Sequence, residues 1–592
     1  MWNFETISVF IVIAFILFSL YLELIGTTFT FVIAIALLGG IGILTPSEML
    51  LGFSNEYIAV ILMLLLLGDI IRKNSIIEVF FNRIFRNSKT QKGFMLKMML
   101  MVAGASAFLN NTPLVAVMMP YVHTWSKKNK VSPSKLLIPL SYAAILGGCV
   151  TLIGTSTNLI VNGMVADQTI FLDFHKIGLF DFSWVGIPML ILGLLYLLLF
   201  SNKLLPSKLD VIDDFSDKYI EYIVEAEVRK NSHLVGKTIT EAGLRDIKGL
   251  YIVKVIRNDI NVAGISPNLD LREGDRLFFA GQTDKIADLV DKESGLTLPE
   301  VGLLRKKRHT DVVEIVISHN SSLINKTVKQ ANFRGKYDSA IIAIHRNGER
   351  IEGRIGDVKL KAGDVLLLLA GVDLQARALD RYDFYFISKI REFRKPEMWK
   401  SIVILGGTAL AILLSALGFV SLFLALIVLM IIILALNITN PKDLPKSIDY
   451  DLAVVIAMAL SLGVAMMKTG VATMIADVFI DVFVPLGNIG LLFGIYFITT
   501  ILAAYITNKA AVAIVFPISI TIAASLGLNP MPFVLIVSFA AAANFMTPIG
   551  YQTNLMIYGP GGYSFKDFFK IGFPLTIIYM IVTVFILNMV YL

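Results

Sequence analysis

Long apolar runs separated by short polar segments fill both ends of this 592-residue chain. The hydrocarbon core of a bilayer, about 30 Å thick, requires roughly 20 consecutive apolar residues of a helix that crosses it. The pattern predicts ten crossings, at 4–22, 25–44, 56–71, 135–165, 183–200, 399–416, 418–437, 450–467, 530–558 and 571–591. The chain is therefore predicted to be an α-helical polytopic membrane protein.

Composition supports this class and locates a soluble insert. The chain is 56% hydrophobic and 16% charged, with a mean hydropathy of +0.74, which excludes a single soluble globular domain. Residues 203–397 hold 33 of the 52 Lys+Arg and 30 of the 45 Asp+Glu. The net charge of +7 is mild and interspersed, so no nucleic-acid partner is expected. A single cysteine, Cys149, excludes an intrachain disulfide, and we expect neither a covalently bound cofactor nor an enzyme, because no membrane segment holds a nucleophile–base or metal constellation.

Basic residues predict the orientation. The loop 72–97 carries seven Lys+Arg against one acid, Glu78, and should be cytoplasmic. If 98–125 enters and returns as a re-entrant hairpin, then the insert 203–397 is also cytoplasmic and both termini lie outside. The mirror segment, about 487–526, is predicted to be a second hairpin. The first apolar run lacks a cleavage signal, so we expect a multi-pass protein of the cell inner (plasma) membrane.

The two membrane halves, 1–202 and 398–592, repeat one another. Residues 110–120 align with 507–517 at an offset of 397, and 154–159 align with 550–555 at an offset of 396. Five predicted crossings separate the two starts, and an odd number inverts the second copy. Inverted repeats are typical of secondary transporters.

Polar residues occupy the tips of both predicted hairpins: Asn110, Asn111 and Thr112 in the first, and Thr507, Asn508 and Lys509 in the second. A tip at bilayer depth leaves backbone groups unpaired unless it lines a polar cavity, and the helix that follows offers amide groups to an anion. The alternative is that Asn and Thr only cap a helix.

Polar breaks interrupt two other apolar runs, at 154–158 and 550–554, and Pro548 supports the second break. Carbonyl groups freed by such a break can hold a cation; alternatively, neighbouring helices satisfy them. Lys509 is the one ionisable residue that we place deep in the membrane, where a charge costs at least about 2.5–3.5 kcal/mol. A bound anion would compensate it, unless the side chain reaches the interface.

These motifs resemble those of the divalent anion–sodium symporter family, within the ion transporter superfamily, whose tips read Ser-Asn-Thr. Both central asparagines stand here, although neither triplet is exact. The resemblance implies elevator-type transport in a homodimer, with sodium where tips and breaks meet. It implies an anion site at Asn110, Asn111, Thr112, Thr157, Asn508, Lys509, Thr553 and Asn554. It implies a sodium site at Ser106, Asn111, Gly154, Thr155 and Asn158.

Lys509 departs from that pattern, because an ammonium at the second tip would repel a second sodium ion. We therefore expect one sodium site, near Asn111 and Gly154, with Lys509 contacting the cargo. A fixed positive charge favours sulfate first and a dicarboxylate second.

The insert carries an internal repeat with an offset of 89: 231–238 aligns with 320–327, and 271–275 with 360–364. Alternating polar and apolar residues predict strands in each copy, with a helix starting at each Lys-Thr pair (237–238 and 326–327). The strands are expected at 221–228, 250–256 and 276–280, and at 311–317, 339–345 and 365–370. The Gly-Asp turns at 274–275 and 363–364 resemble the C-terminal regulatory domain of Trk-type potassium uptake proteins, in tandem at 219–292 and 310–380. The resemblance implies α/β domains that dimerise and bind a small effector such as a cyclic dinucleotide or nucleotide; the alternative is a scaffold.

Three functions therefore compete. The repeats favour a sodium-coupled anion symporter regulated by the insert. A potassium or other cation permease would show intramembrane acids or four glycine-rich filter loops, which the sequence does not reveal. A membrane sensor without transport is distinguished by assay alone.

Overall fold

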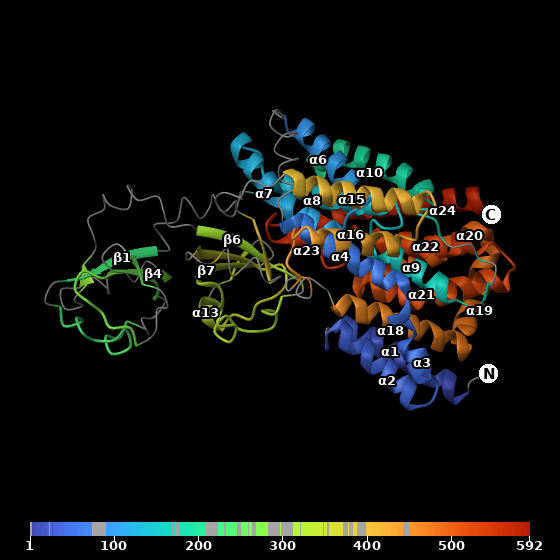
Figure 1. Cartoon of the computed structure of the whole chain (residues 1–592), viewed down its shortest axis with the longest axis horizontal. Helices are drawn as coiled ribbons and strands as arrows, with labels where there is room; N and C mark the ends of the chain where they lie inside the picture. The colour runs from blue at the N-terminus through green and yellow to red at the C-terminus, as the bar shows by residue number, and fades with distance from the viewer. Residues whose placement is uncertain are drawn as a thin grey trace.

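The computed structural model describes most of the chain. The described residues are all of 1–592 except 1–2, 23, 74–89, 169, 172–173, 175–176, 209–222, 230–231, 245–249, 258–259, 263–267, 282–295, 298–311, 320, 347–348, 352–354, 371–373, 375–376, 378–382, 388–397, 442–443 and 445–449. Figure 1 shows one body of packed helices and, beside it, two smaller strand-bearing units.

The first half of the helical body begins with two apolar helices and ends just before the insert. Its elements are α1 (Phe4–Tyr21), α2 (Thr27–Gly40), α3 (Pro46–Leu50), η1 (Leu51–Ser54), α4 (Glu56–Lys73), α6 (Gln91–Ser106), α7 (Asn111–Asn129), η2 (Pro133–Lys135), α8 (Leu137–Gly148), α9 (Ser156–Asp167) and α10 (Ser183–Leu204). The predicted first hairpin is the pair α6 and α7, and its arms are longer than 98–125. The predicted break separates α8 from α9.

The second half follows the same order. Its elements are α15 (Met398–Ala416), α16 (Leu422–Ala435), α18 (Tyr450–Lys468), α19 (Val471–Phe483), η6 (Val484–Leu486), α20 (Gly487–Tyr505), α21 (Asn508–Ser525), α22 (Pro530–Ala542), α23 (Gln552–Tyr558) and α24 (Phe565–Tyr591). The helices α20 and α21 form the second hairpin, and a break separates α22 from α23. The helix α19 lies between the predicted elements 450–467 and 487–526 and was not predicted.

Among the described residues, six helices are long and apolar enough to cross a membrane, or up to seven if the bent pair Pro46–Ser54 and Glu56–Ile71 forms one span. Four further apolar helices are shorter, including α2 and α22. The protein is therefore a multi-pass membrane protein by length and composition, and the number of ten crossings stays a prediction.

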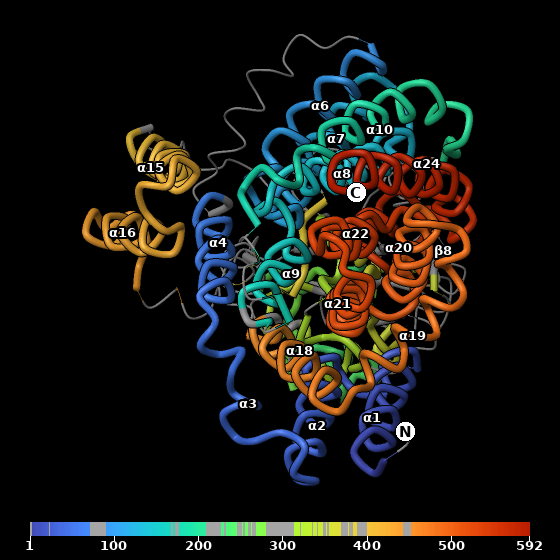
Figure 2. Tube along the Cα trace, turned by 90° about the vertical axis from the view of Figure 1, so that its right-hand side faces the viewer, coloured from blue at the N-terminus to red at the C-terminus, as the bar shows by residue number. Residues whose placement is uncertain are grey.

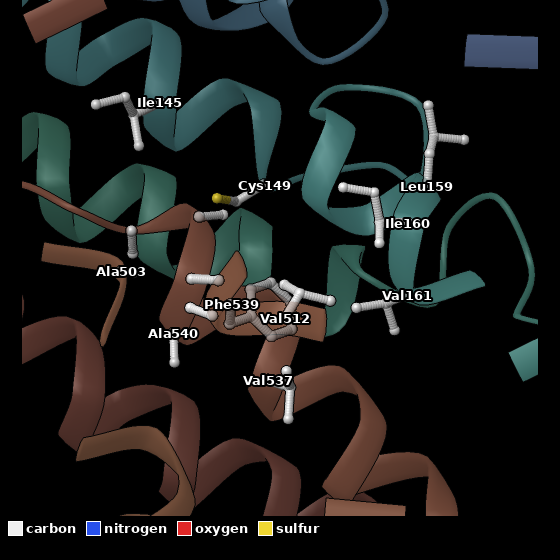
Figure 3. Packing of buried hydrophobic residues seen from close by; sticks show 14 of the residues in the cluster. Ile145, Cys149, Leu159, Ile160, Val161, Ala503, Val512, Val537, Phe539 and Ala540 are labelled. Carbon is white, nitrogen blue, oxygen red and sulfur yellow. The ribbon is translucent and has the colours of Figure 1, made fainter. Parts of the chain in front are cut away.

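Four buried helices, α8, α9, α21 and α22, form the centre of the body (Figure 2). Every residue of α8 and all of α21 from Ala510 to Ala523 are buried, and helices that are apolar all round belong in such a core. The two halves interlock here, because α8 packs against α23 while α22 packs against α9. Figure 3 shows Val512, Phe539 and Ile160 among the apolar side chains that fill this contact below Cys149.

The insert contains two antiparallel sheets with the same strand order. In the first, β3 (Ile260–Asn261), β2 (Leu250–Arg257), β4 (Arg276–Gly281), β1 (Ile223–Val228) and β5 (Leu296–Thr297) are neighbours in that order. In the second, the matching order is β8 (Glu349–Arg350), β7 (Ser339–Arg346), β9 (Val365–Ala370), β6 (Val312–Ile317) and β10 (Phe384–Phe386). The six predicted strands all form.

The same ion pair holds both sheets. Arg257 donates two hydrogen bonds to Asp275, at 2.8 and 2.7 Å, and Arg346 donates two to Asp364, at 2.7 and 2.8 Å. These hydrogen bonds raise the pKa of both guanidinium groups. The repeated Gly-Asp turn therefore positions an acid for an arginine 18 residues earlier.

The predicted Lys-Thr helix starts are wrong. Residues 239–244 form turns, and in the second copy residues 328–332 form turns before the five-residue helix α13 (Phe333–Tyr337). Thr238 and Glu241 exchange two hydrogen bonds and the Ala242 amide donates to the Thr238 carbonyl oxygen, but this turn stops at Gly243, whose φ is +70°.

Candidate functional site

Both hairpin tips end in capped helix N-termini. The side chain of Asn110 accepts a hydrogen bond from the amide of Thr112 at 3.1 Å, and Thr507 accepts one from the amide of Ala510 at 3.2 Å. Capping therefore accounts for the first residue of each tip. Asn111 and Thr112, and likewise Asn508 and Lys509, stand in the first turns of α7 and α21.

Asn111 is the centre of a buried network at the first tip. Its side chain is 2% exposed, and its Oδ1 accepts a hydrogen bond from Ser106 Oγ, which also lies 2.7 Å from the carbonyl oxygen of Ala144. Its Nδ2 donates to the hydroxyl of Tyr551 at 2.7 Å, and that hydroxyl lies 3.1 Å from Thr155 Oγ1. The structure thus brings together three of the five predicted sodium residues.

Gly154 completes this group through a close backbone approach. A Cβ atom at Gly154 would lie 2.4 Å from the carbonyl oxygen of Gly148, so the break tolerates only glycine. One at Gly148 would lie 3.0 Å from Asn111 Oδ1. Hydroxyl, amide and carbonyl oxygens therefore lie close together between the first tip and the first break. Such hard oxygen donors suit Na⁺, and the sodium site stays a prediction.

Each break is closed by an asparagine clamp. Asn158 donates to the carbonyl oxygens of Thr151 at 2.8 Å and Gly148 at 3.4 Å, and its Oδ1 accepts from Ser538 of α22 at 2.7 Å. Asn554 donates to the carbonyl oxygens of Asn544 at 3.1 Å and Thr547 at 3.2 Å, and its Oδ1 accepts from Ser141 of α8 at 2.7 Å. Each half therefore supplies the serine that holds the other half's asparagine.

Further contacts of the breaks also recur in both halves. Thr151 donates to the carbonyl oxygen of Ala107, and Thr547 lies 3.5 Å from that of Ala504. These contacts attach each break to the tip of its own hairpin. Two predicted anion residues, Thr157 and Thr553, are buried in the same region. Whether the clamp residues Asn158 and Asn554 also touch an ion stays a prediction.

One buried group of the first tip is absent from the second. Ala503 stands in the second half where Ser106 stands in the first, at the same offset of 397 that aligns the tips. As a consequence, Asn508 Oδ1 has no hydrogen-bond partner among the described residues. Lys509 follows directly and is half-buried.

Three features of the site differ from the sequence-based prediction. Tyr551 and Gln552 reach the first tip, and Thr112 Oγ1 donates to Gln552 Oε1 at 3.0 Å. In the alignment of the two halves, both residues lie between matched positions, where the first half has Thr155 and Ser156. This difference between the repeats is the signal in the sequence that could have identified them. Asp69, within the predicted crossing 56–71, is 5% exposed, so Lys509 is not the one ionisable residue in the apolar runs.

Comparison with known proteins identifies the family of the chain. The family model described as citrate transporter matches residues 10–498 and 486–592. An uncharacterized transporter from Synechocystis is 31% identical over 98% of this chain and 96% of its own length. An uncharacterized transporter from Escherichia coli is 27% identical over 93% of both chains. Sodium/sulfate cotransporter 1 from Chlamydomonas reinhardtii is 30% identical over 62% of this chain and 43% of its own length.

Proposed function

Because the chain belongs to the citrate transporter family, and is therefore a transporter and not an enzyme, we propose that it carries a divalent anion together with Na⁺ as a secondary active symporter. The observation that carries the proposal is the same arrangement in both halves: a hairpin tip that begins with a helix cap lies against a break that is held by an asparagine. Inverted repeats bring such sites to the middle of a membrane. The exchanged clamps support this arrangement, because Asn158 takes its serine from the second half and Asn554 takes its serine from the first.

Sulfate is our first choice of cargo, and a dicarboxylate is the second. Lys509 places a positive charge at the tip where α21 begins, and helix N-termini favour anions. The relatives named as sodium/sulfate cotransporters agree with this choice.

Uptake into proteoliposomes tests the proposal. We expect purified protein to accumulate radiolabelled sulfate only under an inward Na⁺ gradient, with weaker accumulation of succinate or citrate. A proton gradient without Na⁺ should not replace it. Uptake of K⁺, or of no solute under any gradient, would instead favour a cation permease or a sensor.

A single serine should determine the affinity for sodium. Ser106→Ala makes the first half like the second, which has Ala503, and it removes a hydroxyl from the predicted sodium site. We expect the Na⁺ concentration for half-maximal uptake to rise by about tenfold, the effect of one lost charge-assisted hydrogen bond or ligand, while the rate at saturating Na⁺ persists. The reciprocal variant Ala503→Ser is the control. If sodium binds only at the first tip, it should leave that concentration unchanged, and a large change would speak for a second sodium site.

The transport cycle that we propose is an elevator movement in a homodimer in the plasma membrane. The helices α15 and α16 pack on each other and on α4 at the edge of the body, away from the tips (Figure 2). Both carry large exposed apolar side chains, including Ile402 of α15 at 66% and Ile431 of α16 at 59%. We assign these helices to a stationary part that faces lipid or the second copy, while the hairpins and broken helices move.

Regulation by the insert is supported by its contact with a broken helix. The turn at Gly363, whose φ of +81° favours glycine, packs on Leu555 and Gly559 near the end of α23, and β10 packs against α7. The second sheet thus contacts α7, which carries Asn111 and Thr112, and α23, which begins at Gln552. We propose that a small effector, such as a cyclic dinucleotide or nucleotide, acts on transport through this contact.

Gly559→Ala tests the contact. A Cβ atom there would lie 2.6 Å from both the Gly363 carbonyl oxygen and Val365 Cγ2, so the sheet must shift away from α23. We expect faster proteolysis within the insert and a severalfold change in sulfate uptake. Gly40→Ala, where a Cβ atom meets nothing within 4 Å, is the control. Faster proteolysis with unchanged uptake would reduce the insert to a scaffold.

A further inference from the structure

The polar side chains of the first tip are already engaged by the protein itself. Tyr551 accepts a hydrogen bond from Asn111 Nδ2 at 2.7 Å, and Gln552 accepts one from Thr112 Oγ1 at 3.0 Å. Both partners come from the break in the other half of the chain, 440 residues away. The two contacts together form a bridge, Tyr551–Gln552, across the space between the first tip and the second break.

The reciprocal bridge cannot form at the second tip. The residues equivalent to Tyr551 and Gln552, at an offset of 396, are Thr155 and Ser156. Their side chains are several atoms shorter, and Thr155 lies against the Tyr551 hydroxyl at 3.1 Å. Asn508 Oδ1 has no hydrogen-bond partner in the described part of the chain. The candidate site is therefore asymmetric, with a bridged first tip and a second tip that keeps polar capacity for a ligand.

We propose that Tyr551 and Gln552 determine the size of the cargo: the bridge occupies the first tip, so the anion binds at the second tip alone. This inference rests on the proposed anion symport. An anion with two separated carboxylates needs a polar tip at each end, and here one end meets Tyr551 and Gln552. A compact oxyanion with its charge on one centre, such as sulfate, needs only the second tip, with Lys509 and the first amides of α21.

The energetic reason is the cost of breaking the bridge. A dicarboxylate could reach Asn111 and Thr112 only by displacing the Tyr551 hydroxyl and the Gln552 amide, which would leave buried polar groups without partners. Sites that leave such groups unpaired reject the wrong ligand strongly. The bridge therefore selects against the longer anion without weakening the compact one.

The repeat itself supplies the test variant. Tyr551→Thr/Gln552→Ser gives the second break the residues of the first, and both shorter side chains suit a helix start. Uptake of sulfate and of succinate is measured with an inward Na⁺ gradient, for wild type and variant. We expect the ratio of succinate to sulfate uptake efficiency to rise by about tenfold or more.

Two single variants distinguish the effect of the hydrogen bonds from the effect of side-chain size. They also keep the test valid if the double variant misfolds. Tyr551→Phe keeps the ring and removes only the hydroxyl that Asn111 bonds, so it should admit succinate partly. Gln552→Ser should do the same, through a lower half-saturating concentration and not a higher maximal rate. A double variant that transports sulfate with an unchanged ratio would overturn the inference and leave symport intact. If the double variant does not fold, an unchanged ratio in Gln552→Ser has the same meaning. Wild type that moves neither anion would overturn the proposed function itself.

Discussion

Replacing Asn158 by alanine is expected to destabilise the membrane part by about 3 kcal/mol or more. The side-chain amide of Asn158 is hydrogen-bonded to two backbone carbonyl oxygens of the break and to the Ser538 hydroxyl. All of these groups are buried. Each buried polar group that loses its partner costs about 1–3 kcal/mol. Thermal unfolding in detergent measures the loss, and sulfate uptake should fall with it because the break no longer holds its shape. Asn554→Ala should behave alike.

A neighbour on the same helix provides the matched control. Asn162 of α9 is 1% exposed, and its amide atoms have no hydrogen-bond partner among the described residues. Asn162→Ala should therefore cost little stability. Ser538→Ala should cost about 1 kcal/mol, since it removes only one bond of the clamp. If Asn158→Ala were as mild as Asn162→Ala, the clamp would not be what holds the break.

Neutralising Lys509 is expected to raise the half-saturating sulfate concentration by about 10- to 100-fold. A hydrogen bond to a charged group contributes about 1.5–3 kcal/mol, and each 1.4 kcal/mol is a factor of ten in affinity. Lys509→Gln keeps a long polar side chain, so the change reports on the charge. Sulfate uptake at saturating Na⁺ measures the effect, and Lys509→Arg should recover most of the affinity.

Two further variants sharpen this result. Lys468→Gln removes a lysine that pairs with Glu48 at 3.1 Å, away from the tips, and should leave sulfate affinity unchanged. Lys509→Thr gives the second tip the triplet Thr-Asn-Thr, which should let a second sodium ion replace the ammonium and steepen the dependence of uptake on Na⁺. A Lys509→Thr protein with unchanged affinity and unchanged sodium dependence would remove Lys509 from the site.

Local patterns were sufficient to locate most elements. Apolar runs that end at Asn110 and Thr507 predict the hairpins, because a capping side chain and the apolar stretch that follows it depend only on residues close together in the sequence. Alternation in the insert predicts six strands for the same reason. The helix expected at Thr238 forms only one capped turn, because the chain leaves the helical conformation at Gly243, whose φ is +70°.

The sequence by itself determined a membrane protein with a repeated core, a charged insert, and two polar tips that carry Asn111 and Asn508. These conclusions follow from hydropathy and from alignment of the chain with itself, which need no coordinates. Only the tertiary structure decided which polar groups meet. The clamps at Asn158 and Asn554 and the bridge from Tyr551 to Asn111 join residues 380 to 440 positions apart. Such contacts depend on how the helices pack, because a buried polar group takes whichever partner the packing brings within hydrogen-bond distance.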